Sequence, residues 1–115
     1  MKHINIIYRN DFGISFYWKT AAREVLKAQV VFRDMGFYFT IDQLKTFASQ
    51  TQSAKIQHAC NDCPTPSTCR SLLLKTPSEF IDLAVSREEL YGIQDILDQT
   101  ILRMETQVFM QTALN

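Results

Sequence analysis

The chain has 115 residues, of which 46% are hydrophobic, so its length suits one domain with one hydrophobic core. Its 12 basic and 12 acidic residues cancel, and no run of like charge stands out, which argues against a nucleic-acid partner. No apolar stretch has the length of a signal peptide or a membrane span, so we expect a cytoplasmic protein without a membrane partner.

The two halves of the chain differ in charge. Residues 1–60 carry eight Lys or Arg and four Asp or Glu, whereas residues 61–115 carry four and eight. We interpret the difference as surface charge that has drifted apart between two related parts of one domain. The alternative is electrostatic association of chains head to tail.

Alternating apolar and polar residues on both sides of a turn at 10–13 predict a β-hairpin over residues 3–18. The apolar set of its second half comprises Ile14, Phe16 and Trp18. At period-two spacing we expect these side chains to form the buried face of a sheet. The alternative is that the aromatic rings stack nucleobases.

A first unit of two strands and a helix is predicted over about residues 28–54. The strands turn at Gly36, and the helix starts at Thr40, whose hydroxyl can form a capping box with Gln43. The preceding residues, 19–29, have helical composition without a cap, so either a short helix or an extension of a strand is open there.

A second unit with the same order of elements is predicted over about residues 70–113. Its strands turn around Pro77, and its helix starts at Ser86, which forms a capping box with Glu89. The sequence therefore predicts a single α+β domain over residues 1–115. We expect one antiparallel sheet of about five to six strands with two helices on one face, built by internal duplication of a unit of hairpin and helix.

The last helix is longer than a domain of this size needs, at roughly 40 Å. One apolar stripe runs along its whole length, formed by Leu90, Ile93, Leu97, Ile101, Met104 and Val108. Leu102, Phe109 and Met110 add apolar area off this stripe, and we expect them to form a homodimer interface. The alternative is that the end of the helix frays or bends over the sheet. Gly92, which costs about 1 kcal/mol relative to Ala in a helix, predicts the close approach of a neighbouring backbone.

One segment between the two units holds possible metal ligands: His58, Cys60, Cys63 and Cys69. One imidazole and three thiolates suit a tetrahedral zinc ion, although the second, distant Cys pair of the stronger zinc signature is missing. A redox pair formed by Cys60 and Cys63 is a second interpretation. The third is a plain loop whose cysteines pack as small apolar groups, and in a reducing compartment all three would be thiols.

No catalytic motif occurs elsewhere in the sequence. A glycine-rich phosphate loop, a Gly-x-Ser-x-Gly nucleophile turn and a His-Glu-x-x-His zinc helix are all missing. We therefore expect a protein that is not an enzyme and needs no cofactor.

The second half of the chain combines residues 69–74 (CRSLLL), the Thr76-Pro77 turn and residues 83–90 (LAVSREEL). In these segments it resembles an uncharacterised family of small bacterial domains. It implies an α+β fold and a cytoplasmic bacterial protein, and it implies no activity. The family carries a Cys-x-x-Cys pair near its opening hairpin, where this chain has YWKT at residues 17–20.

Taken together, these features predict a non-enzymatic homodimeric interaction or adaptor module that uses its last helix. The alternative is a zinc-binding structural module, or a metal or redox sensor, that uses the Cys and His residues of the central segment. A third hypothesis is that the basic, aromatic first half binds single-stranded nucleic acid.

Overall fold

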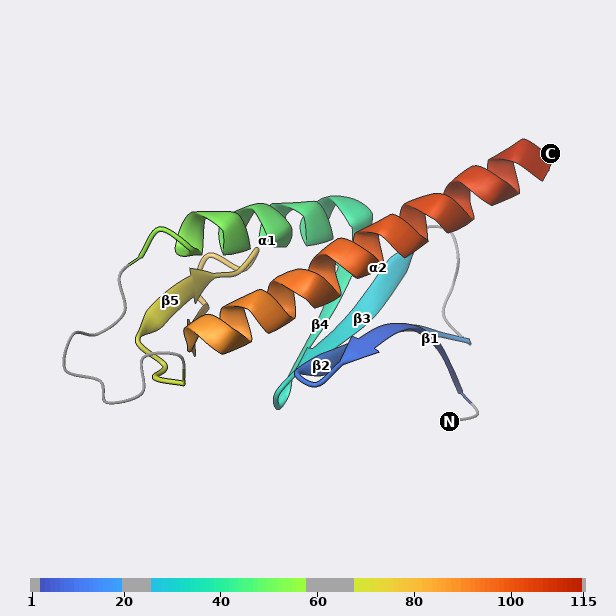
Figure 1. Cartoon of the computed structure of the whole chain (residues 1–115). Coiled ribbons are helices and arrows are strands. Elements are labelled where there is room, and N and C mark those ends of the chain that lie inside the picture. Colours follow the sequence, from blue (N-terminus) through green and yellow to red (C-terminus); the bar gives the residue numbers. More distant parts are fainter. Residues whose placement is uncertain (1–2, 20–25, 58–67, 115) are drawn as a thin grey trace.

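The computed structural model describes residues 3–19, 26–57 and 68–114 (Figure 1). Along the chain the elements are β1 (Ile4–Asn10), β2 (Gly13–Trp18), β3 (Lys27–Phe32), β4 (Met35–Thr40), α1 (Ile41–Ala54), β5 (Leu72–Lys75), β6 (Asp82–Val85) and α2 (Arg87–Leu114). The first four strands form one antiparallel sheet in chain order, and β5 pairs with β6 in a second. The fold is therefore α+β, as the sequence predicts.

Both helices begin where the sequence places a capping box. The Thr40 hydroxyl accepts a hydrogen bond from the Gln43 backbone, and the Gln43 side chain accepts one from the Thr40 backbone. Ser86 and Glu89 exchange the same two bonds, each 3.0 Å long. Because these bonds satisfy backbone donors that the first turn leaves unpaired, they fix where each helix starts.

Both helices pack on one face of the four-stranded sheet, which we call the inner face. A row of paired residues crosses this face: Tyr8, Ser15, Val30 and Phe37. At one end of the row, the Ser15 hydroxyl lies 2.6 Å from that of Thr100 on α2. At the other end, the Phe37 ring contacts Phe47 on α1, with 5.4 Å between ring centroids.

The opposite, outer face of this sheet carries the apolar residues that the sequence assigns to the core. Ile14, Phe16 and Trp18 point to the outer face, because they alternate with Ser15, which contacts α2. Of the three, only Phe16 is buried, and Trp18 is 43% exposed. The prediction of a buried position is therefore confirmed for Phe16 and wrong for Trp18, because period-two spacing shows which residues share a face but not which face the helices cover.

The single sheet of five to six strands was also wrong. The outer edge of β5 is occupied by Gln57, whose amide donates to Leu73 O at 2.7 Å and accepts from Leu73 N at 3.0 Å. On β6, the Arg33 guanidinium donates to Ala84 O at 3.0 Å. Side chains thus take edge positions that another strand would need, and the short hairpin stays separate from the four-stranded sheet.

Gly92 lies where the turn between β1 and β2 meets α2. A Cβ atom at this position would lie 2.2 Å from Cδ2 of Phe12, and Gly92 O accepts a hydrogen bond of 2.9 Å from the Asn10 amide. The neighbour predicted from the sequence is therefore close, but it is an aromatic ring rather than a backbone. The missing side chain lets the first hairpin pack on the helix.

Candidate functional site

The last part of α2 projects from the rest of the molecule (Figure 1). Leu90, Ile93, Leu97 and Met104 are fully buried. After Met104, every side chain of α2 that the structure describes is exposed. The helix therefore continues for almost three turns past the point where its own domain covers it.

The three residues predicted as an interface lie on this part of α2 or next to it. Leu102 is 58% exposed, Phe109 is 70% exposed and Met110 is 53% exposed. Leu102 and Phe109 are seven residues apart and so lie on the same side of the helix, whereas Val108, 40% exposed, continues the stripe that faces the core. We call Leu102, Phe109 and Met110 the terminal patch.

A groove adjoins the terminal patch, between the start of α1 and the end of α2. It has a volume of about 610 Å³, and its apolar walls come from Leu26, Ile41, Val108 and Phe109. Across it, Lys45 on α1 and Glu105 on α2 form an ion pair of 3.0 Å. Since both charged side chains are about half exposed, this pair adds little stability and does not close the groove.

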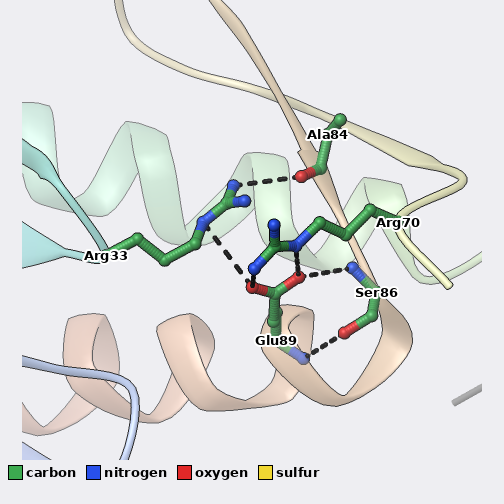
Figure 2. A network of polar contacts seen from close by, with 5 residues as sticks. All are labelled: Arg33, Arg70, Ala84, Ser86 and Glu89. Atoms are coloured by element: carbon green, nitrogen blue, oxygen red, sulfur yellow. Dashed lines mark hydrogen bonds and ion pairs between the residues drawn. The ribbon is translucent and has the colours of Figure 1, made fainter. Parts of the chain in front are cut away.

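A second notable group of side chains surrounds Glu89 at the other end of α2 (Figure 2). The Arg70 guanidinium donates to both oxygens of the Glu89 carboxylate, at 2.9 and 3.0 Å. Arg33, from the turn between β3 and β4, lies 3.6 Å from the same carboxylate and adopts a positive φ of 56°. Only 11% of the Glu89 side chain is exposed. The carboxylate therefore links the start of α2 to the segment before β5 and to the turn between β3 and β4.

The electrostatics of Glu89 follow from these contacts. Burial alone would raise the pKa of the Glu89 carboxyl. The hydrogen bonds from Arg70 and Ser86, together with the positive charges of Arg33 and Arg70, outweigh burial and hold that pKa below its usual value. Glu89 is therefore ionised and engaged at neutral pH, as expected of a structural carboxylate rather than an acid–base catalyst.

Sequence reasoning identified the capping role of Glu89 but missed both arginines. The capping box is a local pattern and can be seen in the sequence. Arg33 and Arg70 reach Glu89 from 56 and 19 positions away, and nothing in the sequence marks that pairing.

Of the predicted metal ligands, only Cys69 lies within the described residues, and it is disulfide-bonded. The expectation of thiols therefore does not hold for Cys69, and a disulfide sulfur is no zinc thiolate. His58, Cys60 and Cys63 lie outside the described residues. In the ranges that the structure does describe, no three His, Cys, Asp or Glu side chains are grouped to hold a metal ion. The zinc site stays a prediction.

Neither helix, over the residues described, combines the length and the apolar character needed to cross a membrane. Comparisons with protein-family models, with curated proteins and with solved structures found no match.

Proposed function

We propose that this protein is a non-enzymatic interaction module and that it forms a homodimer through the terminal patch and the adjoining groove. The observation that carries the proposal is the exposure of Leu102, Phe109 and Met110 on a helix that continues past its own domain. Burying a Leu, Phe or Met side chain contributes roughly 1.5–3 kcal/mol to the free energy of association. In a symmetric dimer these side chains would be buried in both copies.

The few charges at the end of α2 are compatible with a second copy of the chain as the partner. From residue 102 to the end of the helix, the only charged residues are Arg103 and Glu105, one of each sign. Two copies would therefore meet without net repulsion. A partner with a strong charge of its own would find no complementary charge on the terminal patch.

The groove offers room for part of the second copy. Its apolar walls adjoin Phe109, so a helix or side chain placed there would contact both α1 and α2. The two helices would then bury apolar surface that a monomer leaves in water.

The proposal is tested by measuring molar mass in sedimentation experiments over a series of micromolar concentrations. We expect the wild type to approach twice its monomer mass and the Leu102→Glu/Phe109→Glu variant to remain monomeric. The control is Phe80→Glu, which adds the same charge at a residue that is 89% exposed on another part of the surface. A wild type that stays monomeric throughout, or a dimer that the double variant does not weaken, would contradict the proposal.

A further inference from the structure

The outer face of the four-stranded sheet forms a second exposed surface, on the side away from both helices. Ile6, Phe16, Gln29 and Tyr38 form one row across its four strands. By strand alternation, Trp18 and Lys27 belong to the same face. Ile6 is 49% exposed, Trp18 43% and Tyr38 42%, so the face presents apolar and aromatic area that its own domain leaves uncovered.

The charged residues of the four strands all have the same sign. None of the four strands contains an Asp or Glu residue. Arg9 and Lys27 point to the outer face, and Lys19 directly follows β2. In the parts of the chain that the structure describes, the acidic residues all lie outside these four strands. The outer face thus suits an anionic partner, which the overall charge balance did not suggest.

The Trp18 ring is held in place before any partner arrives. Its ring meets Phe16 edge to face, with 5.1 Å between centroids and 80° between planes. Its indole nitrogen donates to the Gln29 amide oxygen at 3.1 Å. Because the one polar atom of the ring is already bonded, Trp18 is held in one orientation with 43% of the residue exposed, and a ring held in this way suits stacking on another flat ring.

Tyr38 provides a second ring on the same face. Gln29 pairs with Tyr38 across β3 and β4, and the Lys27 ammonium lies 5.3 Å from the centroid of the Tyr38 ring. Trp18 lies two strands away from Tyr38 and two residues further along the sheet, which corresponds to roughly 12 Å between their Cα atoms. A positive charge therefore lies over the Tyr38 ring, and the two rings are separated by a distance that an extended single strand of nucleic acid can span.

We propose that the outer face binds single-stranded nucleic acid, with bases stacked on Trp18 and Tyr38 and phosphates placed near Lys27 and Arg9. This function differs from the proposed dimer, which uses the end of α2 and the groove between α2 and the start of α1. A second copy fits this face less well, because a symmetric contact would bring two sets of Arg9 and Lys27 together.

Trp18 is the only tryptophan of the chain, so its fluorescence reports directly on this face. Titration with single-stranded oligothymidylate at low salt is expected to quench the Trp18 emission and to reach saturation. A plot of the logarithm of the binding constant against the logarithm of the salt concentration should have a slope of about −0.7 for each phosphate neutralised. Lys27→Ala should make the slope shallower by about that amount. Lys75→Ala, which removes an exposed lysine from β5, is the matched control and should leave both affinity and slope unchanged.

A second pair of variants tests the stacking. Tyr38→Ala should weaken binding by about 5- to 100-fold, as expected when a base loses an aromatic partner. Tyr91→Ala removes a ring of similar exposure, 51%, from α2 and should have no effect. Circular dichroism establishes that each variant is folded. The proposal is overturned if Trp18 is not quenched at low salt, if Lys27→Ala and Tyr38→Ala bind like their controls, or if anionic vesicles quench Trp18 and the oligonucleotide does not.

Discussion

Arg70 and Glu89, which lie 19 residues apart, are joined by two parallel hydrogen bonds of 2.9 and 3.0 Å. The same carboxylate caps the start of α2 by accepting from the Ser86 backbone at 3.0 Å. The segment before β5 is thereby tied to the first turn of the helix that carries the terminal patch. Charge-assisted bonds in this bidentate geometry are stronger than neutral ones, so this contact helps to determine where α2 begins.

Replacing Glu89 by Gln should lower the free energy of unfolding by about 1–3 kcal/mol at neutral pH, because the network loses its charged acceptor. The folded state holds the pKa of Glu89 below its usual value. The ionised Glu89 carboxylate therefore contributes fully to the stability of the folded state above its unfolded-state pKa of about 4.3. This contribution is lost as the pH falls through the lower pKa of the folded state. Urea unfolding of the wild type and of Glu89→Gln over a pH series measures how the difference in unfolding free energy between them depends on pH.

Glu88→Gln is the control for this prediction, because Glu88 is an exposed neighbour on the same turn. It should change stability little at any pH. If Glu89→Gln remained as destabilising under acid conditions as at neutral pH, the Glu89 carboxylate would not be the source of the effect.

Gly92→Ala should destabilise the protein although Ala is the better helix former. Alanine gains about 1 kcal/mol of helix propensity, but its Cβ atom would lie 2.2 Å from Cδ2 of Phe12. Moving this ring should cost more, so we expect a net loss of about 1–2 kcal/mol. In a Phe12→Ala background the clash is gone, and the same substitution should then be neutral or stabilising. Additive effects of the two substitutions in thermal unfolding would rule out the contact as the cause.

Gln57→Ala should expose the outer edge of β5. The variant loses the bonds of 2.7 and 3.0 Å to Leu73 O and Leu73 N, and we expect about 0.5–1.5 kcal/mol less stability for each. Amide exchange at Leu73, measured by NMR, should become faster. Gln52→Ala, an exposed glutamine on α1, serves as the control and should leave that exchange unchanged.

The starts of both helices could be predicted from the sequence because their determinants are local. Thr40 with Gln43, and Ser86 with Glu89, are three residues apart and make the bonds that this spacing predicts. The division into two sheets could not be predicted. It depends on Gln57 and Arg33, whose side chains reach strand edges 16 and 51 positions away.

The orientation of the first hairpin shows a second limit of the sequence pattern. Its alternation is correct, but a register shift between Ile6 and Tyr8 turns Tyr8 toward α2. The polar Ser15 faces the helix because Thr100 satisfies its hydroxyl. A hydrophobicity pattern assigns Ser15 to the solvent side, since it contains no information on a partner 85 residues away.

Of the two candidate surfaces, the terminal patch could be predicted from the sequence and the outer face of the four-stranded sheet could not. The excess length of α2 and the off-stripe positions of Leu102, Phe109 and Met110 follow from helical periodicity alone. The outer face follows only from the strand pairing, which puts Gln29 opposite Tyr38, and from the Lys27 ammonium lying over the Tyr38 ring.

Amide hydrogen exchange of α2 at low and at high micromolar protein concentration tests the proposed dimer most directly, because it reports both association and its location. We expect the backbone from Leu102 onward to become protected as the concentration rises, while the buried first half of the helix stays equally protected throughout. Exchange beyond Met104 that is the same at both concentrations would contradict the account.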